Sequence, residues 1–367
     1  MARATAKRVF AFDLGEVTGA IGDSITVLPL VVALGVLTPA SLVHLLAGFG
    51  VFQVVWGVHY GVPLSVEPMK ALASLAIAGA IGYGDLLTAG LLAGCLLLIS
   101  GRLGAVSRLT DFIGEPVVRG VQFAVACLLV LTAADLVAAA PAVAAVGVAV
   151  AAVVAFLSPR AVALAVLAVG LGWAVTTNGV PMPTAPSLTV FPNGFPTLSL
   201  DAIEGLIAQL AMTVGNAAVA TSLLLSDYYD ADISPDRLAE SMGSMNLLVI
   251  PFGGLPMCHG SGGLAGKHAF GARTATANLI AGCLYLALAA VAGLLVAFPM
   301  ALLGVLLVIV AGSLARRAFT ESDRWLFVAS VGGLAVLTNV GLAFVAGAVW
   351  WQSSERASRF CPPSEEA

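Results

Sequence analysis

The sequence has few charged residues, and this shortage excludes a soluble globular protein. Only 10% of the 367 residues are Asp, Glu, Lys or Arg, whereas 60% are hydrophobic. Soluble domains carry about a quarter charged residues, because polar groups must cover a surface that faces water. Ala, Val, Leu and Gly fill long apolar runs, without the alternating polarity of a transmembrane β-strand. The composition therefore predicts close-packed membrane helices.

Cysteine and histidine are also sparse, which argues against two kinds of site. The five cysteines lie far apart, and four of them fall in apolar segments, so no disulfide framework is indicated. Cys258 and His259 are neighbours, but one such pair lacks the ligand number and spacing of a metal site. We therefore expect no metal, no cofactor and no nucleic-acid partner. The lipid bilayer is the first partner that the composition implies.

Fourteen apolar segments approach the roughly 20 residues that a membrane-crossing helix needs. They are predicted at 17–36, 39–57, 62–82, 85–101, 112–134, 136–157, 160–177, 201–226, 238–251, 253–272, 275–297, 299–315, 323–337 and 338–351. The last two could instead form a single long span. The sequence thus predicts an all-α membrane protein with about fourteen transmembrane segments.

The positively charged residues predict how these segments are oriented. With the N-terminus in the cytoplasm, every Lys and Arg except Lys70 falls on the cytoplasmic side, including Lys267, Arg316 and Arg317. This distribution is the one that the positive-inside rule favours. We therefore expect a multi-pass protein of the plasma membrane, with both the N-terminus and the C-terminus in the cytoplasm.

The two halves of the chain resemble each other. The stretch "GVPLSVEPMKALAS" from Gly61 aligns without a gap on "GLPMCHGSGGLAG" from Gly254, at an offset of 254 − 61 = 193 residues. The same offset relates several other positions: Gly22 and Gly215, Asp23 and Asn216, Gly50 and Gly243, Gln53 and Asn246, and Pro63 and Pro256. In the predicted topology the two copies begin on opposite sides of the membrane. The repeat is therefore inverted, as in many transporters.

The repeat divides the chain into four parts. We expect a first inverted repeat over 1–180, an extracellular linker over 181–200, a second inverted repeat over 201–351 and a cytoplasmic tail over 352–367.

Each repeat contains a segment that resists helix formation. In the third segment, Pro63 and Pro68 bias the residues before them toward extended backbone, and a helix is expected from Pro68 with Glu67 as its cap. In the tenth segment, "PFGGLPMCHGSGG" is expected to be non-helical and "LAGKHAFGA" helical. Non-helical backbone at membrane depth is tolerated only where it is buried in protein or lines a cavity.

Inversion of the repeat brings the N-termini of the two half-helices face to face near the middle of the membrane. Their free N–H groups and their dipoles make this place suitable for an anion. Gly260, Gly262 and Gly263 permit a close approach of the backbone amides to a ligand. The broken segments therefore predict an anion-binding site.

Several side chains near this site have a functional and a structural interpretation. An intramembrane lysine needs a negative partner, so Lys70 either pairs with Glu67 or helps to hold the anion. Asp23 either carries a proton or makes a structural hydrogen bond, and His259 either donates to the anion or is structural. Asn216 is either a ligand or a packing residue. Interhelical hydrogen bonds are expected from Gln53, Gln209 and Asn246.

Two other functions deserve comparison. The word "HGSGG" suggests an intramembrane serine hydrolase with Ser261 as nucleophile, but His259 and His268 lie on the same broken segment and are poorly placed as its base. A hydrolase would also leave the repeat unexplained, so we expect no enzyme. An anion channel of the same architecture is not separated from a carrier by these residues.

At these residues the chain resembles the molybdate transporter family of the sulfate permease (SulP) superfamily. The words that carry the resemblance are "GAIGDSITVLPLVVAL", "YGVPLSVEPMKALAS" and "MNLLVIPFGGLPMCHGSGGLAGKHAFGART". The resemblance implies two inverted seven-segment repeats arranged as a core domain and a gate domain. It also implies import of a tetrahedral dianion, molybdate or alternatively sulfate, with a coupled cation that we expect to be a proton. A homodimer is a further candidate assembly.

The resemblance also carries over residues by position. These are Asp23, Glu67, Pro68, Met69, Lys70, Asn216, His259, Gly260, Ser261, Gly262, Gly263 and Arg273. The predicted substrate-binding set is Glu67, Met69, Lys70, Asn216, His259, Gly260, Ser261, Gly262 and Gly263, and Asp23 or Glu67 is predicted to carry the coupling ion. The family usually has Gln before "PMK", where this chain has Glu67. A carboxylate there repels an anion unless it is protonated or paired with Lys70.

Overall fold

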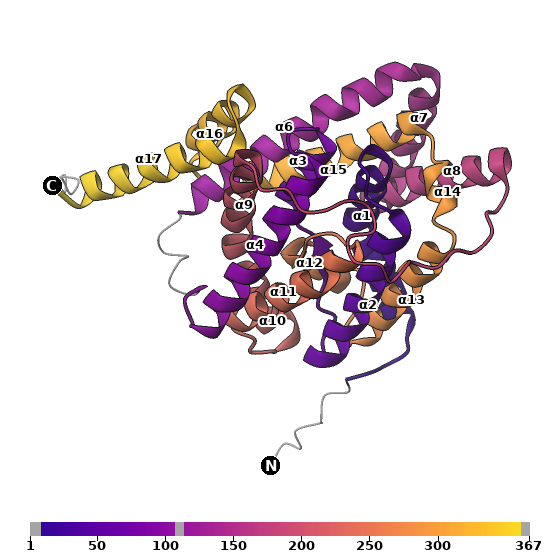
Figure 1. Cartoon of the computed structure of the whole chain (residues 1–367), viewed down its shortest axis with the longest axis horizontal. Coiled ribbons are helices and arrows are strands. Elements are labelled where there is room, and N and C mark those ends of the chain that lie inside the picture. Colours follow the sequence, from indigo (N-terminus) through magenta and orange to yellow (C-terminus); the bar gives the residue numbers. More distant parts are fainter. Residues whose placement is uncertain (1–8, 107–113, 361–367) are drawn as a thin grey trace, which may run out of the picture.

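The computed structural model describes residues 9–106 and 114–360, and these are mostly helical (Figure 1). The first half of the chain forms α1 (Leu14–Leu37), α2 (Leu42–Tyr60), β1 (Val66–Pro68), α3 (Lys70–Ile77), α4 (Tyr83–Arg102), α6 (Glu115–Ala139), α7 (Pro141–Leu157), η1 (Pro159–Ala161) and α8 (Val162–Asn178). The second half forms α9 (Leu200–Met212), η2 (Thr213–Ala220), α10 (Thr221–Tyr229), α11 (Pro235–Val249), η3 (Ile250–Phe252), β2 (Met257–His259), α12 (Ser261–Ala269), α13 (Thr276–Ala290), α14 (Gly293–Val296), α15 (Met300–Thr320), α16 (Trp325–Leu337) and α17 (Val340–Phe360).

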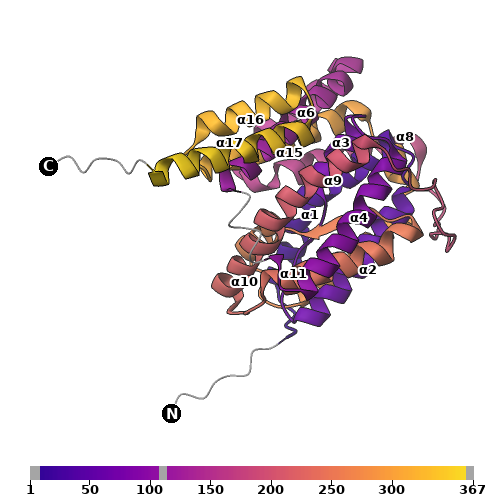
Figure 2. The same cartoon turned by 60° about the vertical axis from the view of Figure 1, so that its left-hand side comes forward.

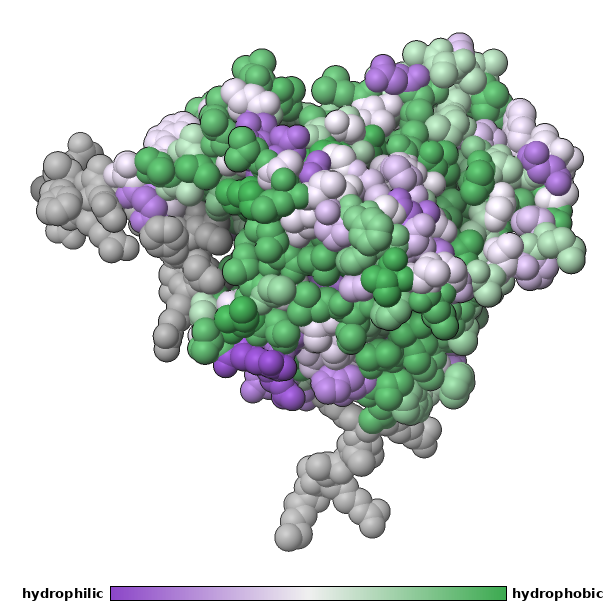
Figure 3. Space-filling model, in the orientation of Figure 1, coloured by the Kyte–Doolittle hydropathy of each residue, from purple (hydrophilic) through white to green (hydrophobic). Residues whose placement is uncertain are grey.

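These elements match the predicted segments in number and order. We count β1 with α3, β2 with α12, α9 with η2 and α10, and α13 with α14 as one segment each, and we leave out the short turns η1 and η3. The described residues then form fourteen segments. In the described part of the chain, six helical runs are long and apolar enough by themselves to cross a membrane, among them Leu200–Tyr229. Apolar residues also cover much of the visible outer surface (Figure 3). The prediction of an all-α membrane protein is confirmed.

The helices gather into two domains, a core and a gate (Figure 2). In the core, α2 packs along α13 and α4 packs along α11, while α1 contacts both α12 and α13. In the gate, α15 and α16 pack on α6, and α7 and α8 pack on α15. The gate meets the core mainly where α17 contacts α9, α3 contacts α6, and α1 contacts α15.

The two extended segments pair with each other inside the core. The short strands β1 and β2 are antiparallel, and Val66 lies opposite His259. Because 259 − 66 = 193, Val66 lies opposite its own repeat equivalent, so the two-fold axis of the inverted repeat passes through this pair. Pairing also satisfies backbone groups that would otherwise be exposed at membrane depth. The predicted inverted repeat is confirmed.

Both half-helices begin at other residues than expected. Pro68 belongs to β1 and lies opposite Met257, so α3 begins two residues later at Lys70, with Met69 as its N-cap. In the second copy α12 begins earlier, at Ser261, and its first turn includes Gly262 and Gly263. The reason is tertiary in both cases: strand pairing holds Pro68 extended, and a carboxylate from β1 accepts the Gly263 amide in the first turn of α12.

Two helices of the gate extend beyond their predicted ends. The twelfth segment was expected to end at residue 315, but α15 continues through Arg316 and Arg317 to Thr320. The last segment was expected to end at residue 351, but α17 continues to Phe360. Charged residues favour the end of a membrane span without breaking a helix, so hydropathy marks the apolar stretch rather than the helix.

The prediction that Lys267 faces the cytoplasm is wrong. Its side chain is fully buried between α12, α1, α2 and α13. Its ammonium group lies 3.2 Å from Asp23 Oδ2 and donates to Gln53 Oε1 at 3.0 Å and to Asn278 Oδ1 at 2.6 Å. The Leu64 carbonyl is a fourth oxygen, at 3.4 Å. Hydropathy could not reveal this lysine as buried, because its partners come from three other helices and a loop.

Candidate functional site

A small cavity lies where β1 and β2 lead into α3 and α12. It is lined by Glu67, Lys70, Gln209, Met212, Asn216, Ala217, Cys258, His259, Gly260 and Ser261. Its free volume is about 20 Å³, enough for about one water molecule. An ion as large as a tetrahedral oxyanion therefore enters only if a lining side chain moves. Six of the lining residues belong to the predicted substrate-binding set: Glu67, Lys70, Asn216, His259, Gly260 and Ser261.

Lys70 and Glu67 form an ion pair at the centre of this cavity. The Lys70 ammonium contacts Glu67 Oε2, and the side chains are 17% and 1% exposed. The other carboxylate oxygen, Oε1, accepts the Gly263 amide of α12 at 2.6 Å. Glu67 thus connects a cation of α3 with the N-terminus of α12. A side chain on Gly260 would overlap this carboxyl group, so the glycine makes room for it.

The backbone amides at the N-termini of the two half-helices have different hydrogen-bond partners. At α3, Gln209 of α9 accepts the amides of Ala71 and Leu72 at 3.0 and 3.2 Å. At α12, the N-cap is Gly260, which has no side chain to accept a hydrogen bond. The amides of Ser261 and Gly262 make no hydrogen bond within the described part of the chain. The anion-binding capacity of helix N-termini is therefore greater at α12 than at α3.

Ser261 and His259 also line the cavity, and each makes hydrogen bonds to other residues of the core. The Ser261 hydroxyl donates to Asn216 Oδ1 at 2.9 Å. This hydrogen bond uses the side-chain oxygen of Asn216 and not its Nδ2 hydrogens. His259 is fully buried, with Nε2 2.7 Å from Ser241 Oγ and Nδ1 3.2 Å from the Ser65 carbonyl. Since a carbonyl only accepts, Nδ1 carries the hydrogen and Nε2 accepts from Ser241. His259 therefore lines the cavity with its ring rather than with a free donor.

Six predicted or matched residues lie outside the lining of this cavity; two of them, Asp23 and Pro68, belong to α1 and β1. Met69 is buried at the start of α3 and donates its amide to the Pro256 carbonyl at 2.8 Å. Gly262 and Gly263 belong to the first turn of α12, just behind the lining. Arg273 is exposed beyond the other end of α12, where it donates to the His268 and Ala272 carbonyls.

Asp23 belongs to the buried network around Lys267. Its Oδ1 accepts the Ser65 hydroxyl at 2.5 Å, and its Oδ2 accepts the Gln53 side-chain amide at 2.9 Å. Gln53 also donates to the Val66 carbonyl, as Asn246 donates to the Met257 carbonyl in the other repeat. These residues tie the core helices to the strands, as expected for Gln53 and Asn246.

Sequence reasoning did not assign Gln209, Met212, Ala217 and Cys258 to the site. Gln209 was expected only as an interhelical hydrogen bonder, and its bond to the start of α3 depends on how α9 packs. Met212 and Ala217 carry no polar signal. Cys258 lies opposite Glu67 in the strand pair, and only this pairing brings it to the cavity.

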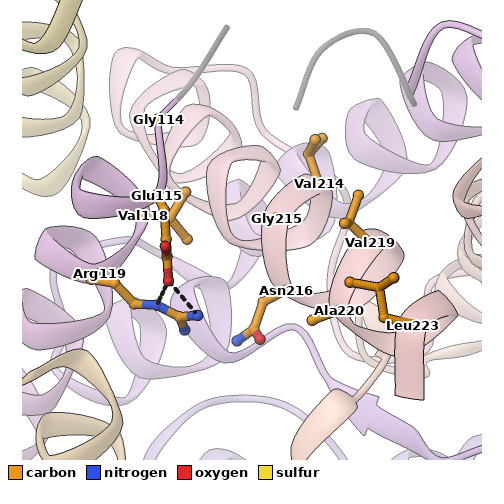
Figure 4. Close-up of a pocket in the computed structure, with 10 residues that line it drawn as sticks. All are labelled: Gly114, Glu115, Val118, Arg119, Val214, Gly215, Asn216, Val219, Ala220 and Leu223. Carbon is orange, nitrogen blue, oxygen red and sulfur yellow. Dashed lines mark hydrogen bonds and ion pairs between the residues drawn. The ribbon is translucent and has the colours of Figure 1, made fainter. Parts of the chain in front are cut away.

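A larger cavity adjoins the small one (Figure 4). It has about 330 Å³ of free volume and lies between α6 of the gate and the η2–α10 run of the core. Its lining is Gly114, Glu115, Val118, Arg119, Val214, Gly215, Asn216, Val219, Ala220 and Leu223. Asn216 lines both cavities, so we call the larger one the vestibule. In Figure 4 the Asn216 and Arg119 side chains approach from opposite walls.

The wall of the vestibule has two unusual features. Arg119 is paired with two carboxylates, Glu321 at 2.7 Å and Glu115 at 3.3 Å. The helix η2, which carries Asn216, is a π-helix over Thr213–Ala220. Its wider turn is a form that occurs frequently at functional sites. Neither feature was predicted from the sequence; the Arg119–Glu321 pair depends on the packing of α6 against α15 within the gate.

Comparison with solved structures identifies the fold. The transmembrane domain of the cyanobacterium bicarbonate transporter BicA superimposes with a TM-score of 0.66 at 17% identity, over 90% of this chain and 97% of that chain. Murine Slc26a9, an anion transporter in the inward-facing state, superimposes with a TM-score of 0.68 at 11% identity, over 95% of this chain and 69% of that chain. This likeness defines the fold: a helical membrane domain built from two inverted repeats.

The chain belongs to the molybdate transporter family, and it is an anion transporter. The family model described as "Molybdate transporter of MFS superfamily" matches residues 15–129 and 201–314, more than half of the chain and one stretch in each repeat. Molybdate transporter 1 of Arabidopsis thaliana is 26% identical over 95% of this chain and 91% of its own length. Molybdate transporter 1 of Chlamydomonas reinhardtii is 27% identical over 91% and 90%.

Proposed function

We propose that this protein is a secondary-active importer of molybdate that couples uptake to a proton. The site is the small cavity between the half-helices, and the observation that carries the proposal is the Lys70–Glu67 pair at the N-terminus of α12. We place the protein in the plasma membrane with both termini in the cytoplasm, and the family within the SulP superfamily. The fold shared with the bicarbonate transporter and Slc26a9 supports this last assignment.

The donors around the cavity support an oxyanion as the ligand. Lys70 supplies a positive charge, and the amides of Ser261 and Gly262 supply hydrogen bonds along the axis of α12. The side-chain amide of Asn216 adds a donor from η2. A tetrahedral dianion presents oxygens in four directions, so it suits donors that converge from α3, α12 and η2.

The Glu67 carboxylate supports coupling to a proton. It contacts the same two groups that an incoming anion needs, the Lys70 ammonium and the first turn of α12. A proton on Glu67 removes this competition, releases Lys70 to the anion and turns one carboxyl oxygen into a donor. Proton and anion then favour each other's binding, and this reciprocal linkage is what symport requires.

Asp23 is the alternative proton carrier, and its surroundings favour it less. Both of its carboxylate oxygens accept hydrogen bonds, and Lys267 lies 3.2 Å from one of them. A proton on Asp23 would leave the buried Lys267 ammonium without its counter-charge, which is costly. A proton on Glu67 leaves behind Lys70, which is partly exposed and can turn to the anion.

Transport then follows from motion of the core against the gate. The vestibule lies between these domains and meets the cavity at Asn216, so it is the path by which we expect the anion to leave toward the cytoplasm. The half-helices and their strands move as one body, since the strands pair with each other. Movement of this body past α6 and α15 would close the vestibule and open the opposite side.

The experiment that tests this function is radiolabelled uptake into proteoliposomes, with molybdate and sulfate measured separately. An inward proton gradient should drive molybdate accumulation above the external concentration, with little competition from excess sulfate. Preferred sulfate uptake would keep the site and change the substrate. Flux that only equilibrates the anion would favour a channel, and no uptake of either anion would refute the proposal.

A further inference from the structure

Arg317 of the gate reaches the first turn of α12 in the core. It lies near the end of α15, and its guanidinium group covers Gly262 in the first turn of α12. A Cβ atom added to Gly262 would overlap Nη1 of Arg317 and lie 3.0 Å from both Cζ and Nη2. The Arg317 charge is also close enough to act on the Glu67 carboxylate. The side chain is half-buried, whereas its neighbour Arg316 is exposed.

Arg317 has no paired side chain among those that the structure describes, in contrast to Arg119 and Arg102. Its guanidinium makes no hydrogen bond or ion pair with a group that the structure describes, and the side chains of residues 355–360 lie outside this description. Arg119, on the neighbouring gate helix α6, is paired with two glutamates, and Arg102 is paired with Glu240. A guanidinium group has five donors in a fork that matches two oxygens of an oxyanion. A half-buried fork with no paired carboxylate among the described residues, placed over free helix amides, is arranged to receive an anion.

We propose that Arg317 is the gate's direct contact to the transported anion, so that the bound anion bridges gate and core. The inference rests on the proposed function and adds a residue to its site. Arg317 and Lys70 together supply two positive charges. When Glu67 is protonated, these two charges balance a dianion, and neither residue alone does so.

The position of Arg317 has a consequence for the transport cycle. The other donors, Lys70, Ser261 and Gly262, belong to the core and move with the anion. Arg317 belongs to the gate, so its contact exists only while α12 lies beside this part of α15. The anion should therefore bind more tightly in this arrangement of the domains than after the core has moved. A ligand shifts a conformational equilibrium by this difference in affinity.

The test compares purified wild-type protein with three variants, by calorimetric titration with molybdate at a pH that permits uptake. Arg317→Gln should weaken binding by about tenfold to a hundredfold, the loss expected for hydrogen bonds to a charged group. Arg317→Lys should fall between this variant and the wild type, since it keeps the charge and loses the fork. Arg316→Gln is the matched control on the same helix and should bind like the wild type.

A second pair of variants tests the contact without removing the arginine. Gly262→Ala places a methyl group where the guanidinium lies, and the backbone at Gly262 is helical, so the helix tolerates alanine. If the contact matters, Gly262→Ala weakens binding in the wild type and adds little to Arg317→Gln. Full additivity of the two effects would count against a shared contact. If Arg317→Gln proves unable to fold, the same additivity test is made with Gly262→Ala and Arg317→Lys.

The outcomes separate this inference from the proposed function. Wild-type binding that is lost in Lys70→Ala but unchanged within about twofold in Arg317→Gln overturns the role of Arg317 and leaves the site intact. A wild-type protein that neither binds nor transports molybdate or sulfate overturns the proposed function itself. Loss of binding in Arg316→Gln to the same degree as in Arg317→Gln would point to general surface charge and would also overturn the inference.

Discussion

Two lysines lie in the membrane core of this protein, one in each half-helix, and their surroundings differ. Lys267 of α12 is fully buried and has four oxygen neighbours, including the Asp23 carboxylate. Lys70 of α3 is 17% exposed and contacts one carboxylate, that of Glu67, at the edge of a cavity. The sequence suggested the opposite ranking, with Lys70 as the intramembrane lysine and Lys267 at the cytoplasmic surface.

The difference between the two lysines shows what separates a structural ion pair from one that can bind a ligand. An ammonium group has three hydrogens, and those of Lys267 have more than enough acceptors among Asp23, Gln53, Asn278 and Leu64. Such a pair holds helices together and has nothing left for a ligand. Lys70 lines the cavity and contacts only the Glu67 carboxylate, so we expect that it can exchange Glu67 for an anion. The count of satisfied hydrogens, rather than burial alone, separates the two roles.

The largest effect is expected from breaking the Lys267 pair. Lys267→Ala leaves the Asp23 carboxylate buried beside the Gln53 amide and the Ser65 hydroxyl without its cation. Removal of one partner of such a pair costs about 3–5 kcal/mol. We expect a strong loss of monodisperse protein in detergent and a much lower thermal midpoint. A Lys267→Met, Asp23→Asn double variant should recover part of the loss. A midpoint equal to that of the wild type would show that Lys267 does not hold the core together.

The next largest effect is expected from Lys70→Ala, which should weaken binding far more than it lowers stability. Lys70→Ala should remove most molybdate binding, by about tenfold or more, since it deletes a charge-assisted contact to the anion. Its thermal midpoint should change far less than that of Lys267→Ala, because Glu67 can take up a proton beside the cavity. Titration with molybdate and a thermal unfolding curve measure both. Unchanged affinity would contradict the proposed site.

A change of pH dependence is expected from Glu67→Gln. A glutamine still accepts the Gly263 amide but carries no charge to pair with Lys70 and takes up no proton. In the wild type, acidification should tighten molybdate binding, because protonation of Glu67 frees Lys70. In Glu67→Gln the affinity should be high and nearly constant between mildly acidic and neutral pH, and uptake should no longer follow the proton gradient. If the variant keeps the wild-type pH dependence, Glu67 is not the carrier, and Asp23 becomes the candidate.

The smallest effect is expected from Ser261→Ala. The change removes the hydroxyl that donates to Asn216, while the Ser261 amide remains in the first turn of α12. A neutral hydrogen bond is worth about 1 kcal/mol, so the affinity should fall about fivefold. Titration against Lys70→Ala in the same buffer gives the comparison. A loss as large as that of Lys70→Ala would mean that Ser261 and Asn216, rather than Lys70, dominate binding.

The sequence by itself determined the membrane fold, the inverted repeat and the two broken segments. Apolar stretches set the number of segments, because an uncharged helix is what a bilayer accepts. The offset of 193 residues between the repeats reappears in the pairing of Val66 with His259. Prolines and glycines marked the broken segments, because they alter the backbone whatever surrounds them.

Only the tertiary structure decided which polar groups meet. Strand pairing moved the start of α3 to Lys70, and Glu67 drew the Gly263 amide into the first turn of α12. Lys267 found its partners on α1, α2 and α13, and Arg317 reached α12 from the gate helix α15. Hydropathy and local propensity describe one segment at a time. The role of a charge in a membrane depends on its partners, and these come from segments far apart in the chain.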